Sequence, residues 1–192
     1  FIVSVISGLF FMLMASDEFA AQISHLASHD PLTNIYNRRA FDERATRSLS
    51  NSRKKGKTSV LLTLDLDYFK DINDRFGHST GDRALKSVVG AITSHLRKHD
   101  IFGRYGGEEF CILLPETTEE HALHVAERLR WAIQEVTILT DTEHPTTLTA
   151  SIGLACDSNK QIGLEALFNQ SDRALYDAKS KGRNQVVMCP ST

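Results

Sequence analysis

Asp65 and Asp67 form the first pair of residues whose types and spacing could do chemistry. They alternate with Leu64 and Leu66 at the end of an apolar run. Because successive side chains of a strand point to opposite faces, we expect both aspartates on one face and the leucines in the core. Two adjacent carboxylates repel each other unless a positive charge lies near them. The pair therefore predicts either a cation site or, as the simpler alternative, ordinary charges at the end of a strand.

A second carboxylate pair, Glu108 and Glu109, follows Gly106 and Gly107, which are a strong signal for a two-residue hairpin turn. If this hairpin pairs beside the first strand, acids from both elements converge. Carboxylate oxygens suit hard cations such as Mg²⁺ or Mn²⁺. Two such ions beside a triphosphate would activate a hydroxyl group and stabilise the leaving pyrophosphate.

Polar residues elsewhere could bind a nucleotide. Lys70 and the backbone N–H groups around it follow the first acids and could meet phosphate oxygens. Asn73 and Asp82 could read guanine, since a carboxylate accepts from two N–H groups that adenine lacks. Lys179 and Arg183 stand four apart at the end of a predicted helix, which would place both cations on one helix face. They could hold a triphosphate, or simply complement the helix dipole.

The composition fits one globular domain with a short extension. The chain has 192 residues, of which 41% are hydrophobic and 24% charged, and its formal charge is −2. This net charge gives no sign of a basic surface, so we expect no binding to bulk nucleic acid. Three cysteines without CxxC spacing favour thiols in a reducing compartment. His121 and His124 lie one helical turn apart, but on a predicted solvated face rather than in a metal site.

The first 15 residues carry no charge and are apolar all around a helix. A spanning helix needs about 20 residues, so we expect residues 1–15 to be the end of a truncated transmembrane helix. A buried or oligomerising helix is the alternative. Residues 16–29 place Phe19, Ile23 and Leu26 on one stripe, which predicts a helical stalk that could pair with its copy. A helix break at Pro31 puts the start of the main domain at residue 30, so that it spans 30–192.

The main domain alternates between strand and helix patterns. Strands are predicted at 59–66, 101–105, 109–114, 147–155 and 184–189, and helices at 38–49, 81–97, 118–134 and 164–180. Gly182 is a predicted C-cap, and residues 140–145 are predicted to form an exposed loop. The order gives an α+β fold with a ferredoxin-like split βαβ (βαββαβ) core, in which helices flank a central sheet that contains antiparallel strands.

Four ordered motifs resemble those of GGDEF domains, the diguanylate cyclase family. They are DPLTNIYNRR (30–39), DLDYFKDINDRFGHSTGD (65–82), RYGGEEF (104–110) and ALYDAKSKGRN (174–184). The GGEEF string alone is moderately specific, whereas four motifs in order over most of the chain are far more so. The resemblance implies the fold of palm-type nucleotidyl cyclases. It also implies an enzyme that condenses two GTP molecules into cyclic di-GMP and releases pyrophosphate.

The resemblance further implies roles for single residues. Asp65, Glu108 and the Leu66 carbonyl would bind Mg²⁺ or Mn²⁺, two ions per GTP site, with Asp67 nearby. Glu108 and Glu109 would be catalytic, and Glu108 would assist deprotonation of the 3′-hydroxyl group. The residues implied to bind substrate are Phe69, Lys70, Asn73, His78, Asp82, Gly106, Gly107, Lys179 and Arg183.

Arg97 and Asp100 fit the family's RxxD inhibitory site, which would bind the product cyclic di-GMP. A helix-end arginine and a loop aspartate are the alternative. The resemblance implies a homodimer, because one domain holds only half of the reaction site. With the N-terminal segment, it also implies anchoring in the inner (cytoplasmic) membrane, with the catalytic domain in the cytoplasm.

Two other functions compete with this expectation. The domain could be a non-catalytic receptor that binds cyclic di-GMP through Arg97 and Asp100, although such a receptor has no use for the carboxylate site. It could also be a palm-type cyclase that uses ATP, which Asn73 and Asp82 argue against. Metal-dependent turnover of GTP and of ATP would discriminate among the three.

Overall fold

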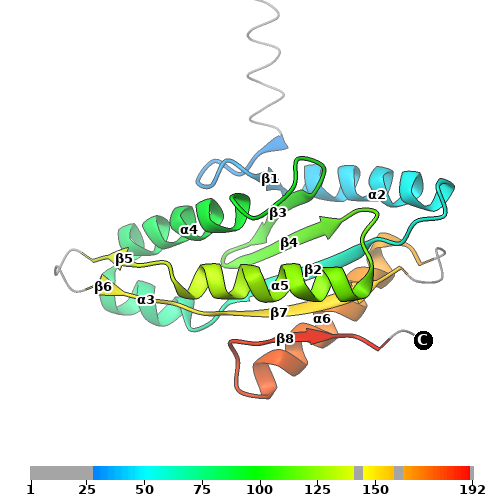
Figure 1. Cartoon of the computed structure of the whole chain (residues 1–192). Helices are drawn as coiled ribbons and strands as arrows, with labels where there is room; N and C mark the ends of the chain where they lie inside the picture. Colours follow the sequence, from blue (N-terminus) through cyan, green and yellow to red (C-terminus); the bar gives the residue numbers. More distant parts are fainter. Residues whose placement is uncertain (1–27, 141–144, 158–161, 191–192) are drawn as a thin grey trace, which may run out of the picture.

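The computed structural model describes residues 28–140, 145–157 and 162–190. Six strands form one mixed sheet in the order β1-β3-β4-β2-β7-β8 (Figure 1). These strands are β1 (Tyr36–Asn37), β2 (Val60–Leu66), β3 (Ile101–Gly106), β4 (Glu109–Leu114), β7 (Ala150–Cys156) and β8 (Val186–Met188). β5 (Ile138–Leu139) and β6 (Pro145–Thr146) pair separately. The helices are α2 (Arg38–Lys54), α3 (Phe69–Phe76), α4 (His78–Thr93), α5 (Glu119–Gln134) and α6 (Leu164–Ser180).

The predicted βαββαβ core is confirmed. It consists of β2, the helices α3 and α4, the β3–β4 hairpin, α5 and β7. β2 lies in the middle of the sheet and pairs antiparallel with both β4 and β7. The short strands β1 and β8 extend the sheet in parallel at its two edges.

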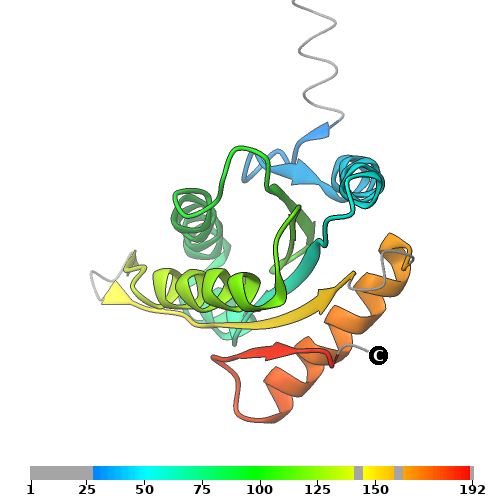
Figure 2. The ribbon, with the colours of Figure 1, turned by 45° about the vertical axis from the view of Figure 1, so that its right-hand side comes forward.

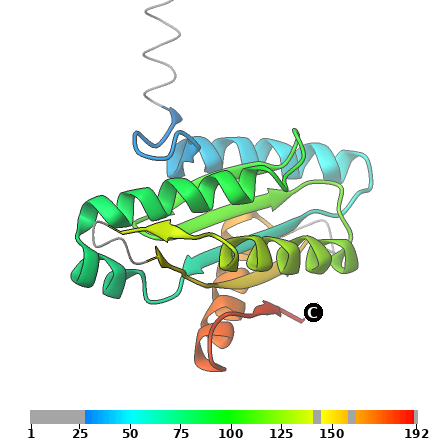
Figure 3. The same ribbon diagram turned by 60° about the vertical axis from the view of Figure 1, so that its left-hand side comes forward.

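Helices cover both faces of the sheet, with α4 and α5 on one face and α2 and α6 on the other (Figures 2 and 3). Every residue of β2 is consequently buried. Leu62 and Leu64 belong to the larger core, which α3, α4 and α5 share. Leu61 points the other way and packs in a second core with Phe41 of α2 and Leu167 of α6. A strand buried on both faces explains the continuous apolar run in the sequence.

Several predicted boundaries shift. The helix predicted at 38–49 continues to Lys54, the one predicted at 81–97 covers 78–93, and the strand predicted from 147 begins at Ala150. The hairpin turn lies at Gly107–Glu108 instead of Gly106–Gly107, because Gly106 still pairs with Glu109. The prediction of an exposed loop at 140–145 is correct only in part at its two ends.

At those two ends, Thr140 is buried and Pro145 belongs to β6, while residues 141–144 lie outside the described part of the chain. Within that part, no helix is long and apolar enough to cross a membrane. The segments predicted as a transmembrane end and a stalk fall almost entirely on residues 1–27, which are also outside it.

Candidate active site

The predicted convergence of acids occurs at the end of β2. The register of β2 and β4 sets Asp65 directly opposite Glu109, and the backbone N–H of Leu66 donates to the Glu108 carbonyl at 3.3 Å. The hairpin therefore carries both glutamates to the strand that holds Asp65. This pairing follows from the 4-1-3-2 strand order of the split βαβ core, which makes the first strand and the hairpin neighbours.

Asp65 lies in a charged and largely dry environment. The residue is 8% exposed, and the Lys179 ammonium lies 2.8 Å from its Oδ2 atom. Burial raises the pKa of this carboxyl group, the contact with Lys179 opposes the rise, and the charges of Glu108 and Glu109 add to it. Three carboxylates thus repel one another here, and one partly exposed cation, Lys179, opposes this repulsion.

The donor set suits a hard divalent cation. Asp65 and Glu108 offer carboxylate oxygens, and a metal ion would neutralise the charge of Asp65, whose pKa is raised first by burial and then by the charges of the two glutamates. Among the described residues, no group of three or more His, Cys, Asp or Glu side chains is already arranged to hold a metal. The Lys179 ammonium contacts the Asp65 oxygen that a cation would need. A metal ion would therefore take over part of this lysine's role.

The hairpin is held by Arg104, which lies in the RYGGEEF motif but is not among the predicted site residues. Arg104 donates to the Gly107 carbonyl through Nε at 3.0 Å and through Nη2 at 2.7 Å. A Cβ at Gly106 would lie 3.3 Å from the Glu109 carboxylate, and one at Gly107 would meet nothing within 4 Å. Among the described residues, the Glu109 carboxylate would thus crowd a side chain at position 106, whereas no contact explains the glycine at position 107.

The predicted base-binding residues lie on the pair of helices α3 and α4. Asn73 is half-buried on α3, while His78 and Asp82 are exposed on α4. A Cβ on Gly81 would lie 2.0 Å from Asn73 Oδ1, so the missing side chain leaves room for the amide between the helices. Gly81 is not among the residues predicted from the sequence, although a glycine inside a helix is a recognised signal of a packing constraint.

The predicted phosphate-binding residues come from two segments. Lys70 is exposed in the first turn of α3, whereas the Phe69 side chain is buried, so Phe69 could reach a phosphate only through its backbone N–H. The prediction that Lys179 and Arg183 share a helix face is wrong, because α6 ends at Ser180. Arg183 lies in a left-handed turn, and its guanidinium stacks 4.7 Å from the centre of the Tyr68 ring.

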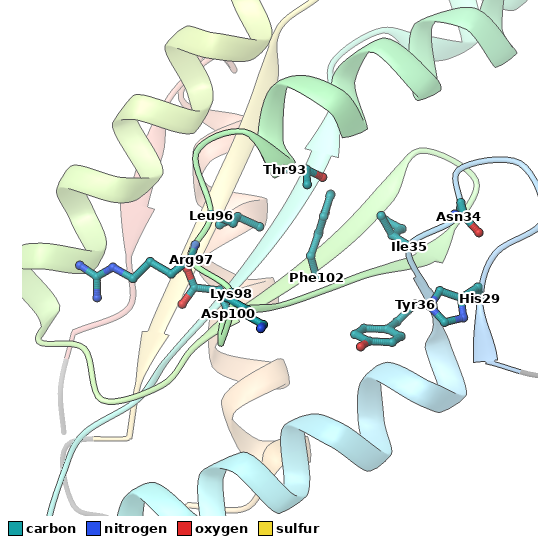
Figure 4. A pocket seen from close by; sticks show the side chains of 10 residues that line it. All are labelled: His29, Asn34, Ile35, Tyr36, Thr93, Leu96, Arg97, Lys98, Asp100 and Phe102. Carbon is teal, nitrogen blue, oxygen red and sulfur yellow. The ribbon is translucent and has the colours of Figure 1, made fainter. Parts of the chain in front are cut away.

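Arg97 and Asp100 line a cavity of about 300 Å³ between the start of the domain and the end of α4 (Figure 4). Asp100 Oδ2 accepts from the Arg97 backbone N–H at 2.8 Å. Its Oδ1 atom is buried and accepts no hydrogen bond from the described residues, and burial raises the pKa of the group. The Arg97 side chain extends away from the cavity and contacts His121 of α5. The two RxxD side chains are therefore close in sequence but not joined to each other.

The geometry agrees with comparisons to known proteins. The sequence model of the family described as "Diguanylate cyclase, GGDEF domain" matches residues 27–185. The chain is 41% identical over 157 residues to the diguanylate cyclase DgcP of Pseudomonas aeruginosa, which covers 82% of this chain and 23% of the relative. It is 36% identical over 166 residues to the probable diguanylate cyclase DgcT of Escherichia coli, over 85% of this chain and 36% of the relative.

The chain thus spans about a quarter to a third of the length of these two curated relatives. Among solved structures, the coiled coil and GGDEF domain of DgcB from Caulobacter crescentus, in complex with c-di-GMP, superposes with a TM-score of 0.89 at 28% identity. That similarity covers 96% of this chain and 97% of the DgcB chain. On the family match, the shared fold and the ordered motifs, the chain belongs to the GGDEF domain family.

Proposed function

We propose that this domain is a diguanylate cyclase that condenses two GTP molecules into cyclic di-GMP in a metal-dependent reaction. The observation that carries the proposal is the meeting of Asp65 with Glu108 and Glu109 at one end of the sheet, beside the ammonium of Lys179. A carboxylate site of this kind next to phosphate-binding cations serves phosphoryl-transfer chemistry. Relatives named as diguanylate cyclases support the same activity.

In the proposed reaction, the 3′-oxygen of one GTP attacks the α-phosphorus of the other. A new P–O bond forms, the bond from the α-phosphorus to the bridging oxygen breaks, and pyrophosphate leaves. The proton of the 3′-hydroxyl group passes to a base, for which Glu108 is the candidate. Mg²⁺ or Mn²⁺ held by Asp65, Glu108 and the Leu66 carbonyl would supply Lewis-acid stabilisation of the phosphate charge. A second, equivalent transfer closes the ring.

The chain's own residues would bind and orient GTP. Asn73 and Asp82, from neighbouring helices, would accept and donate along the guanine edge, with His78 close to the nucleotide. Lys70, Lys179 and the Phe69 backbone N–H would contact the phosphates. Arg183 would add a guanidinium, which suits phosphate because it donates several hydrogen bonds in one plane.

Ring closure requires two copies of the domain. Each copy would present one GTP and half of the catalytic groups, and two copies facing each other antiparallel would exchange attacking and leaving groups symmetrically. In this proposal, residues 16–29 set the dimer geometry and residues 1–15 attach the chain to the inner membrane, with the domain in the cytoplasm.

The product, cyclic di-GMP, would inhibit the enzyme by binding at Arg97 and Asp100, the RxxD residues. The buried Oδ1 of Asp100 accepts no hydrogen bond from the described residues and lies in a cavity that Arg97 also lines, which supports a site that takes an N–H donor such as guanine. The same observation favours the second candidate function, a receptor that binds cyclic di-GMP without making it. The buried Asp65 and its Lys179 partner argue for catalysis, since a receptor gains nothing from a desolvated carboxylate beside two others.

Identification of the product tests the proposal. The purified chain is incubated with GTP or ATP, with Mg²⁺ or with a chelator, and the nucleotides are separated by chromatography. We expect cyclic di-GMP only where GTP and Mg²⁺ are both present. Glu108→Gln should lower the rate of its formation about 10³-fold. Glu116→Gln, an exposed acid paired with Lys55 away from the site, is the matched control and should retain activity. Binding of cyclic di-GMP without any turnover of GTP would favour the receptor.

A further inference from the structure

Asp67, two residues beyond Asp65, forms hydrogen bonds with other parts of the chain. The residue is 4% exposed, and its carboxylate accepts hydrogen bonds from Thr149 Oγ1 at 2.7 Å, Ser151 Oγ at 2.7 Å and the Asn184 backbone N–H at 3.0 Å. A buried carboxylate with three donors is well satisfied where it lies. Its charge is stabilised by these hydrogen bonds from within the chain, whereas the Asp65 carboxylate contacts the Lys179 ammonium, whose place a metal ion could take.

The third of these donors belongs to an unusual turn. After α6, Gly182, Arg183 and Asn184 adopt φ values of 114°, 62° and 45°, all in the left-handed region. For the two non-glycine residues this conformation costs energy, so it persists only where surrounding contacts impose it. Asp67 imposes it at Asn184, and the Asn184 side chain is held in addition by Arg130 of α5 at 2.8 Å.

Tyr68 meets the same turn from the other side. It is itself left-handed, with a φ of 56°, and remains 61% exposed at the start of α3. The Arg183 guanidinium lies 4.7 Å from the centre of its ring, and Nη1 donates to the Tyr68 hydroxyl at 3.4 Å. Stacking fixes the plane of the guanidinium and leaves N–H groups at its edge free to meet an anion.

We infer that Asp67 and Tyr68 are positioning residues for the triphosphate, which act through Arg183, and that Asp67 is not a metal ligand. Asp67 anchors the turn and Tyr68 orients the guanidinium, so the end of β2 supplies one metal-binding acid, Asp65, and one structural acid. The inference rests on the proposed function in taking Arg183 as a phosphate ligand. Asp67 and Tyr68, directly after Leu66, thus set the affinity for the phosphate chain and not for the base.

Binding measurements separate these roles. The ligands are GMP and a GTP analogue in which a methylene group replaces the α–β bridging oxygen, so that pyrophosphate cannot leave. Both are titrated calorimetrically into the wild-type chain and its variants at saturating Mg²⁺, and binding of the analogue is also measured over a range of Mg²⁺ concentrations. We expect Tyr68→Ala to weaken binding of the analogue about threefold and to leave GMP unchanged, while Tyr68→Phe, which keeps the ring, binds close to wild type.

For Asp67→Asn, we expect binding of the analogue to weaken about tenfold, again without loss for GMP, and an unchanged Mg²⁺ concentration for half-maximal binding. Equal losses of affinity for GMP and for the analogue would overturn the positioning role. A Mg²⁺ requirement raised tenfold or more would make Asp67 a metal ligand. The Tyr68 pair keeps the test valid if Asp67→Asn does not fold. Because the analogue cannot react, failure of the wild type to make cyclic di-GMP would refute the proposed function without touching these results.

Discussion

Arg104 Nη1 donates to Asp30 Oδ1 at 3.0 Å, and the same guanidinium holds the Gly107 carbonyl of the hairpin turn. Asp30 is the first residue of the predicted main domain, so one side chain links the start of the domain to the residue before Glu108. Burial opposes ionisation of Asp30, but hydrogen bonds from Thr33 and Arg104 outweigh it and lower the pKa of the group. A displacement of the segment before Asp30 would therefore be passed to the hairpin.

The first prediction concerns this link. Arg104→Ala should lower kcat at least tenfold, since a shift of about 1 Å in a catalytic group is costly, while the circular dichroism spectrum stays that of the wild type. Arg47→Ala, an exposed arginine on α2, is the control. Steady-state kinetics at saturating GTP provide the measurement. An Arg104→Ala variant with wild-type kcat would show that the hairpin keeps its position without Asp30.

A pair of glycine substitutions in α4 tests the base site. Gly81→Ala would put a Cβ 2.0 Å from Asn73 Oδ1 and displace the amide, so KM for GTP should rise about tenfold. Gly90→Ala lies in the same helix with nothing within 4 Å of the added Cβ. It should leave KM unchanged and stabilise the domain by about 1 kcal/mol. If the two variants had the same KM, Asn73 would have no part in binding GTP.

Asp65→Asn should separate activity from stability. Its folded-state pKa lies above the ordinary 3.8, so the carboxyl group favours folding when protonated at low pH and disfavours it as pH rises through the folded pKa. The variant should lose at least a hundredfold in kcat. It should also unfold at a higher temperature than the wild type, by a margin that grows from pH 4 to pH 7.

Lys179 does not cancel this gain, because its side chain is 34% exposed and can be hydrated without Asp65. Thermal unfolding followed by circular dichroism at several pH values gives the comparison. A variant less stable than the wild type at pH 7 would mean that the Asp65–Lys179 contact outweighs the burial of the carboxylate.

The cavity of Arg97 and Asp100 gives a prediction on product inhibition. Product inhibition would make the progress curve level off early in turnover. Arg97→Ala should abolish this plateau without a change in initial rate, because the residue follows the end of α4 and lines a cavity that does not include Asp65. His121→Ala, which frees the Arg97 side chain from its contact on α5, should retain inhibition. Progress curves with and without added cyclic di-GMP distinguish these cases. Inhibition that persists in Arg97→Ala would place the inhibitory site elsewhere.

Much of the fold followed from local patterns. The apolar run of β2, the helical spacing of α5 and α6 and the glycine pair of the hairpin predicted these elements and their order. The hairpin turn was displaced by one residue because Gly106 remains in the ladder opposite Glu109. Helix ends were the least accurate, as α4 shows by ending at Thr93, four residues before Arg97.

The site was predictable as a set of residue types but not as a set of contacts. Asp65 and Lys179 could be named from the sequence, whereas their 2.8 Å contact depends on how α6 packs against β2. The difference between the contacts of Asp65 and those of Asp67 also depends on packing between distant segments. Two acids in one short motif have different contacts, because Ser151 and Asn184, far away in sequence, donate hydrogen bonds to Asp67, whereas Asp65 contacts Lys179.

The dependence of activity on protein concentration tests the central claim most directly. Initial rates of cyclic di-GMP formation are measured at saturating GTP and Mg²⁺ over a wide range of concentrations of the purified chain. A domain that holds half of the reaction site predicts a specific activity that rises with concentration and then levels off as the dimer forms. A constant specific activity, in a chain that sedimentation shows to be monomeric throughout, would contradict the account.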